Sequence, residues 1–184
     1  MNELRVKGHG LTGMLSAITV IEGEAVRSKV EARLPDDLRD ALRLGAVVAG
    51  GFYPIGWARA IHERALEEGS KGAQLPFLIG YESTKKDLQG IYAFVAKMFN
   101  PGTVLGQGKR LMAMYYGGGT ADVLERSSTS ATLRYRECFG FDRAMFEELA
   151  GGSVAIMEAC GGRNAQADIR SVSSAAMEAA YRWE

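Results

Sequence analysis

The amino-acid sequence predicts an α+β fold in which N-terminal helices pack with a C-terminal four-stranded antiparallel sheet crossed by one long helix. Apolar residues follow a helical spacing through most of residues 1–119, and after that point they alternate with polar residues in short runs. With 184 residues and 47% apolar content, the chain has the size of a single domain. We therefore expect one domain over 1–184, with a helical part at 1–119 and a mixed part at 120–184.

Four helices are expected before residue 70. Apolar spacing predicts a helix at 11–22 and, after Gly23, a second one through Leu34. A third helix begins at Pro35, because proline and the aspartates that follow it suit a first turn, and its apolar positions continue to Gly50. The fourth helix begins at Pro54 and ends at Gly69.

The next helical region covers residues 75–99. A polar stretch at 82–87 interrupts its apolar spacing, so the pattern predicts either one helix with a kink near 80–84 or two helices. The sequence Asn-Pro-Gly at 100–102 then marks a break. A further helix runs through Val104 and Tyr115 and ends at the three glycines of 117–119.

The mixed part reads in the order strand, strand, helix, strand, strand. Alternation predicts strands at 121–126 and 130–138, and in the second of these the arginines share one side while Leu133 and Tyr135 share the other. A helix of about 20 residues follows Gly140 and ends at Gly161. Two more strands, from Ala167 to Val172 and over 177–183, complete the sheet.

The composition excludes some classes of partner and site. Lysine plus arginine equals aspartate plus glutamate, at 22 each, so nucleic acid is not an expected partner. The sequence contains no signal peptide and no apolar run long enough for a membrane span, and its two cysteines suit a reducing compartment, so we expect a cytoplasmic protein. Two widely separated histidines do not predict a metal site, and adjacent acids such as Glu147 and Glu148 are interpreted as solvated. No cofactor is predicted.

Residues 130–172 resemble a paralogous family of uncharacterised proteins found in myxobacteria. The resemblance extends over most of the chain through the segments VKG at 6–8, LPDDLR at 34–39, YPIGWA at 53–58 and FNPG at 99–102. The family implies no particular activity for this chain.

The order of elements is more distantly similar to a superfamily of heme nitric-oxide-binding domains, 4-vinyl-reductase-like domains and subunits of the TRAPP transport complex. That resemblance implies an enclosed apolar ligand or a dimer surface. The heme domains also use a proximal histidine and a Tyr-x-Ser-x-Arg motif. Here the stretch at 135–139 reads Tyr-Arg-Glu-Cys-Phe, without the serine and the last arginine, and no histidine follows His62.

Two groups of residues are candidates for a binding site. The first is cationic and could bind a carboxylate or phosphate, because guanidinium groups match such anions in two-point geometry. The alternative for this group is a solvated sheet edge with pairs to Glu125 and Glu137. Its members are Arg126, Arg134, Arg136 and Arg143.

The second group is apolar and aromatic, and it belongs either to the core or to a cavity or dimer interface. Its main members are Met112 and Tyr115, with Met98, Phe99, Met114 and Tyr116 nearby.

These observations predict a non-enzymatic module of bacterial signalling or regulation that binds a ligand or a protein and forms a homodimer. The ligand would be an apolar or anionic small molecule. One alternative is a small enzyme that uses Cys138 beside the arginines. The other is a heme-based gas sensor that binds its iron through His62.

Overall fold

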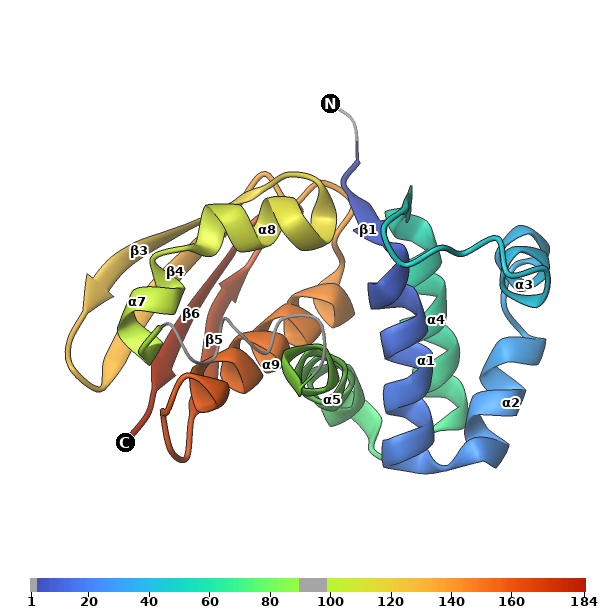
Figure 1. Cartoon of the computed structure of the whole chain (residues 1–184), viewed down its shortest axis with the longest axis horizontal. Coiled ribbons are helices and arrows are strands. Elements are labelled where there is room, and N and C mark those ends of the chain that lie inside the picture. Colours follow the sequence, from blue (N-terminus) through green and yellow to red (C-terminus); the bar gives the residue numbers. More distant parts are fainter. Residues whose placement is uncertain (1–2, 90–98) are drawn as a thin grey trace.

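The computed structural model describes residues 3–89 and 99–184. Figure 1 shows two neighbouring parts, with helices α1 to α4 on one side and a sheet on the other, and helices α5 and α9 lie between them. One cluster of buried apolar residues contains side chains from both parts, for example Leu11 and Ile18 of the helical part and Leu133 and Tyr181 of the sheet.

The predicted α+β architecture is confirmed. Strands β3 (Thr120–Arg126), β4 (Ser130–Arg136), β6 (Met177–Arg182) and β5 (Gln166–Val172) form an antiparallel sheet in the spatial order β3-β4-β6-β5. Helix α9 (Arg143–Ala159) packs on this sheet and, on its other side, against α5 (Leu75–Gln89). The side chain of Asp142 caps α9 by accepting a hydrogen bond from the backbone N–H of Met145.

Four helices form the N-terminal part, as predicted: α1 (Gly8–Glu22), α2 (Glu24–Ala32), α3 (Asp36–Arg43) and α4 (Ile55–Glu68). The prediction that α3 continues to Gly50 is wrong. The helix ends at Arg43, and Gly45 follows with φ +66°, a backbone conformation that favours glycine and stops the helix.

A two-stranded sheet was not predicted. Strand β1 (Arg5–Lys7) pairs antiparallel with β2 (Phe52–Pro54), with Val6 opposite Tyr53. Each strand has only three residues, so alternation over such a short run is not distinguishable from chance.

Of the two expected arrangements, one kinked helix or two helices, the structure has one continuous helix through residues 80–84. Within the polar stretch, Ser83 and Thr84 are buried and Asp87 is half-buried, whereas Lys85 and Lys86 are exposed. The predicted apolar positions Ile91, Val95 and Met98 lie outside the described residues.

After residue 99 the expected single helix is two. The short helix α7 (Pro101–Leu105) is capped by Asn100, whose side chain accepts a hydrogen bond from the backbone of Thr103, and α8 (Gly108–Tyr116) follows. Gly117, with φ +69°, ends α8 as predicted.

Helices α5 and α9 approach each other closely at two glycines. A Cβ atom on Gly80 would lie 1.9 Å from the backbone oxygen of Glu148, and one on Gly151 would lie 2.0 Å from that of Phe77. The helix backbones are therefore in direct contact, which only residues without a side chain permit.

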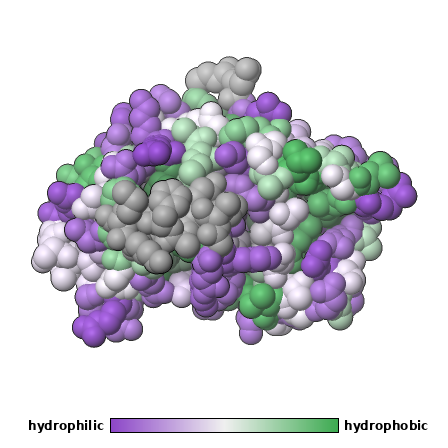
Figure 2. Space-filling view, in the orientation of Figure 1, coloured by the Kyte–Doolittle hydropathy of each residue, from purple (hydrophilic) through white to green (hydrophobic). Residues whose placement is uncertain are grey.

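On the face shown in Figure 2, polar residues cover much of the coloured surface and apolar residues appear in small groups. Among the described residues, the most exposed large apolar side chains are Val20 on α1 and Leu44 and Val48 in the segment that follows α3. Among the described residues, no helix is long and apolar enough to cross a membrane.

Candidate functional site

A pocket lies between α5, α8, α9 and the side of the sheet that these helices cover. It contains a cavity of about 70 Å³. The walls are mostly apolar, and their larger apolar residues are Val6, Leu105, Leu111, Met112, Leu133, Leu149 and Ile156. Such a cavity has room for a few water molecules, since one water needs about 10–15 Å³ measured in this way.

Polar residues line the same pocket from two helices. On α5 the lining residues are Gly80, Ser83, Thr84 and Asp87, a spacing of three and four that places them on one helix face. On α9, Glu148, Gly152 and Ser153 line the pocket in the same way, at positions i, i+4 and i+5. Ser83, Thr84, Glu148 and Ser153 are all buried. The two helices thus direct polar groups into an otherwise apolar cavity.

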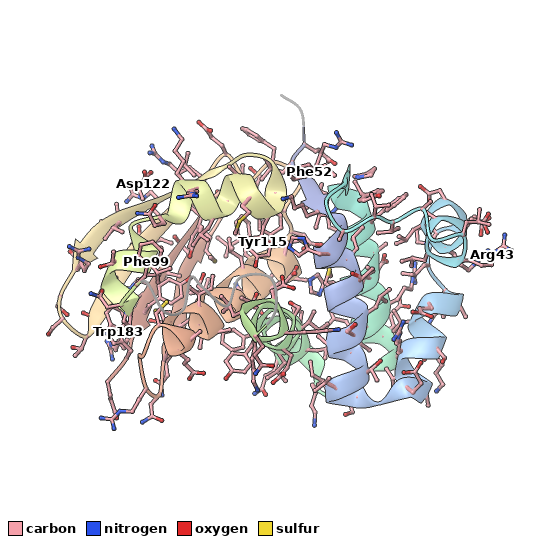
Figure 3. All side chains as sticks on the ribbon, in the orientation of Figure 1. Arg43, Phe52, Phe99, Tyr115, Asp122 and Trp183 are labelled. Atoms are coloured by element: carbon pink, nitrogen blue, oxygen red, sulfur yellow. The ribbon has the colours of Figure 1, made fainter. Side chains whose placement is uncertain are left out.

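Asp87 contacts two aromatic residues at one end of this pocket. Its Oδ2 accepts a hydrogen bond of 3.3 Å from the hydroxyl of Tyr115 and lies 3.4 Å from Nε2 of His9. The His9 and Tyr115 rings meet edge to face, and Figure 3 shows Tyr115 at the end of α8 close to α1. Burial raises the pKa of Asp87, because a carboxylate loses its hydration there, although the nearby His9 opposes this effect.

Glu148 forms a second histidine–carboxylate pair. Its Oε2 lies 2.8 Å from Nε2 of His62, and only 1% of the His62 surface and 9% of the Glu148 surface are exposed. The prediction that Glu148 belongs to a solvated face is therefore wrong: its neighbour Glu147 pairs with exposed Arg143, whereas Glu148 points inward. Neither histidine lines the pocket. Each one contacts a carboxyl group that does, His9 that of Asp87 and His62 that of Glu148.

A hydroxyl network forms part of the sheet side of the pocket. The Tyr135 hydroxyl oxygen lies 2.9 Å from that of Tyr181 and 3.1 Å from Oγ of Ser153. Burial raises the pKa of Tyr135, and it raises the pKa of Tyr116 well above the ordinary value. Both side chains are therefore neutral hydrogen-bonding groups at neutral pH.

The two predicted groups of site residues have different locations. Met112 and Tyr115 line the pocket, together with Tyr116. The four arginines do not line it. Phe99 also lies outside the lining, and Met98 lies outside the described residues.

Each of the four arginines has a partner of its own. Arg134 pairs with Glu178, Arg136 with Asp122 and Arg143 with Glu147, while Arg126 donates to the backbone oxygen of Gly102. These partners differ from the expected Glu125 and Glu137.

Strand register also separates the arginines. Arg126 lies opposite Ala131, on the face of Leu133 and Tyr135, because a register shift after Val123 inverts the alternation of β3. Arg134 and Arg136 lie on the other face of the sheet. Arg126 is therefore not on a common face with Arg134 and Arg136.

Cys138 does not have the properties of a nucleophile. It is fully buried, and burial raises the pKa of its thiol to about 12. Its Sγ lies 3.6 Å from the backbone oxygen of Arg136. At neutral pH the reactive thiolate is therefore scarce.

Sequence reasoning missed Asp87, Glu148 and the small polar residues beside them. A signal for them exists in the sequence, since Gly80, Ser83, Thr84 and Asp87 have the spacing expected of an apolar helix face. Small and polar residues at such positions indicate a face that lines a cavity or packs closely on another helix.

Comparisons with known proteins identify the fold. No family model matches the sequence. No curated protein matches it either. Solved structures of H-NOX proteins, whose fold is the heme nitric-oxide-binding fold, are similar over nearly the whole chain.

One of these structures is the Fe(II) unliganded H-NOX protein from K. algicida, with a TM-score of 0.74 and 14% identity over 97% of this chain and 96% of that one. Another is an oxygen-binding H-NOX domain related to soluble guanylate cyclases, with a TM-score of 0.69 and 9% identity over 97% and 95%. At these identities the similarity shows the fold alone. The chain has the α+β fold of the H-NOX domains.

Proposed function

We propose that this chain is a small-molecule-binding module whose ligand occupies the pocket between α5, α8, α9 and the sheet. The observation that carries the proposal is the pocket itself, in which mostly apolar walls surround a few buried polar groups from two helices. This combination is typical of ligand sites, where apolar walls supply affinity and polar groups fix orientation. The H-NOX fold supports the proposal, since the neighbours include an oxygen-binding domain.

The cavity limits the size of the ligand. Its volume of about 70 Å³ is well below the roughly 300–1,000 Å³ of sites for drug-sized ligands. A molecule of a few heavy atoms matches it. A larger ligand requires side chains to move, and Met112 is suited to such movement because methionine adopts several shapes at low energetic cost. A role in bacterial signalling and a homodimeric state belong to this proposal as predictions.

A heme bound through histidine does not fit the residues present. The sequence contains only His9 and His62, and both stand behind carboxylates outside the lining of the pocket. Burial raises the pKa of Tyr116 and Tyr135, so neither is a phenolate at neutral pH, and the Tyr115 hydroxyl donates a hydrogen bond to Asp87. Two carboxylates in the wall would also repel the heme carboxylates. We therefore propose a ligand other than heme, and we expect no Soret band from histidine-ligated heme after incubation with hemin.

The enzyme alternative is not part of the proposal. It needs a reactive Cys138 beside an arginine cluster. The thiol is buried with a raised pKa, and each arginine has a partner elsewhere.

The ε-methyl group of Met112 provides a direct test of ligand binding. We expect n-butanol, n-butylamine or butyrate to shift the ¹³C-methyl NMR signal of Met112 in a saturable way. Leu111→Trp fills the pocket from a half-buried position and should abolish the shift, whereas Ala113→Trp, on an exposed position of the same helix, should preserve it. The proposal is refuted if none of the three probes shifts the signal, or if Leu111→Trp leaves the shift unchanged.

A further inference from the structure

The charged groups that line the pocket are of one sign. Asp87 and Glu148 are carboxylic acids, and the described residues of the lining include no lysine, arginine or histidine. The pocket is therefore unsuited to the anionic ligand that the sequence suggested, because a buried anion beside buried carboxylates is repelled.

Each of these carboxyl groups has one oxygen engaged by the protein. His62 contacts Oε2 of Glu148, and Tyr115 and His9 contact Oδ2 of Asp87. Among the described residues, the hydrogen bonds and ion pairs of these two groups are made by Oε2 of Glu148 and Oδ2 of Asp87. Both groups thus retain acceptor capacity for a ligand, since an ionised carboxylate can accept several hydrogen bonds.

The His62 contact orients Glu148 without neutralising it. Among the described residues, Nδ1 of His62 is buried and has no hydrogen-bond partner. The tautomer that carries its proton on Nε2 donates to Glu148 and leaves no buried donor unpaired. In this tautomer His62 orients the Glu148 carboxyl group through one oxygen and leaves the other oxygen for a ligand donor.

From these contacts we propose that the natural ligand is an apolar primary amine, bound as its ammonium ion to the carboxylates of Asp87 and Glu148. The inference rests on the proposed function, because it assigns a ligand class to the same pocket. An ammonium group has three N–H donors and no acceptor, which matches a wall whose charged groups are carboxyl groups with acceptor oxygens. Burial raises the pKa of Asp87, and a bound cation would oppose that effect.

The remaining walls restrict the amine to one charge. Beyond the two carboxyl groups, the lining residues that the structure describes are aliphatic residues, methionine, small residues, Ser83, Thr84 and Ser153, and the tyrosines Tyr115, Tyr116 and Tyr135. A second ammonium on the same ligand would lie against apolar side chains and lose its hydration without a partner. Monoamines with a short alkyl chain are therefore expected, and polyamines are not.

Three probes of similar size test the ligand class. n-Butylamine is a cation at neutral pH, n-butanol is a neutral donor and butyrate is an anion. In the full chain at pH 7, followed through the Met112 methyl signal, we expect n-butylamine to bind about 10-fold or more tightly than n-butanol, since hydrogen bonds to charged groups exceed neutral ones by this order. Butyrate should bind more weakly than n-butanol.

Two variants identify the carboxylates responsible. Glu148→Gln and Asp87→Asn should each weaken n-butylamine binding about 10-fold and weaken n-butanol binding much less, because only the amine carries a charge. Glu147→Gln is the matched control, because Glu147 is adjacent in sequence, pairs with Arg143 and does not line the pocket. If Glu148→Gln does not fold, Asp87→Asn tests the proposal by itself.

The outcomes separate the two proposals. Equal binding of n-butylamine and n-butanol, or tighter binding of butyrate, refutes the amine assignment and leaves the pocket proposal standing. Amine binding that is equally strong in Asp87→Asn and Glu148→Gln also refutes the assignment. If no probe binds, both proposals fail.

Discussion

The closest contact between α5 and α9 makes Gly80→Ala the sharpest structural test. The added Cβ would lie 1.9 Å from the Glu148 backbone oxygen, about 1 Å inside the closest approach that real Cβ atoms show. Alanine in place of glycine favours the helix by about 1 kcal/mol. Overpacking costs about 1–3 kcal/mol, and the upper end applies here because the contact is with backbone rather than with a flexible side chain. The expected net loss of unfolding free energy is therefore about 2 kcal/mol.

Urea unfolding and calorimetry measure this loss. For a domain of this size, a loss of about 2 kcal/mol lowers Tm by roughly 4–8 °C. Gly56→Ala in α4 is the control, because its Cβ would meet only the end of the Arg59 side chain at 3.6 Å. Gly80→Ala and Gly151→Ala together should cost less than the sum of the single changes, since one separation of the helices relieves both contacts. If Gly80→Ala is as stable as Gly56→Ala, the described helix contact is wrong.

Three further predictions concern the buried titratable groups. His62→Ala should lower the unfolding free energy by about 3 kcal/mol, because it leaves the Glu148 carboxylate buried without a donor, and Glu148→Gln in the same chain should recover part of this loss in a double-mutant cycle by urea unfolding. Asp87 has a raised folded-state pKa, so its contribution to stability is fully present below the unfolded pKa and decreases as the pH rises through the folded value. Urea titrations should therefore show Asp87→Asn gaining stability relative to the wild type as the pH rises above about 4, the ordinary aspartate pKa, and a pH-independent difference would contradict this. Iodoacetamide should label Cys138 of the folded protein far more slowly than a free thiol, with normal rates restored in denaturant; labelling at the free-thiol rate before unfolding would show that the thiol is accessible.

Much of the architecture was predictable because its signals are local. The helix starts at Pro35 and Pro54, the end of α8 at Gly117 and the alternation along β4 depend on neighbours within a few residues. Met112 and Tyr115 were also among the candidate residues, because the sequence has an excess of large adaptable side chains near the helix-to-sheet junction. Both line the pocket.

The site required the tertiary structure. Glu147 and Glu148 are the same residue type one position apart, yet one pairs with exposed Arg143 and the other is buried against His62, which is 86 positions away in the chain. Likewise, Ser83, Thr84 and Asp87 interrupt the apolar spacing in the sequence. In the structure they line a cavity that α8 and α9 enclose against α5. The sequence alone determined most of the longer helices and the four strands of the large sheet, because hydrogen bonds and side-chain contacts within a helix turn or along a strand have a fixed period. Only the tertiary structure decided which carboxylates face the pocket, because their burial depends on partners brought together by packing rather than by sequence spacing.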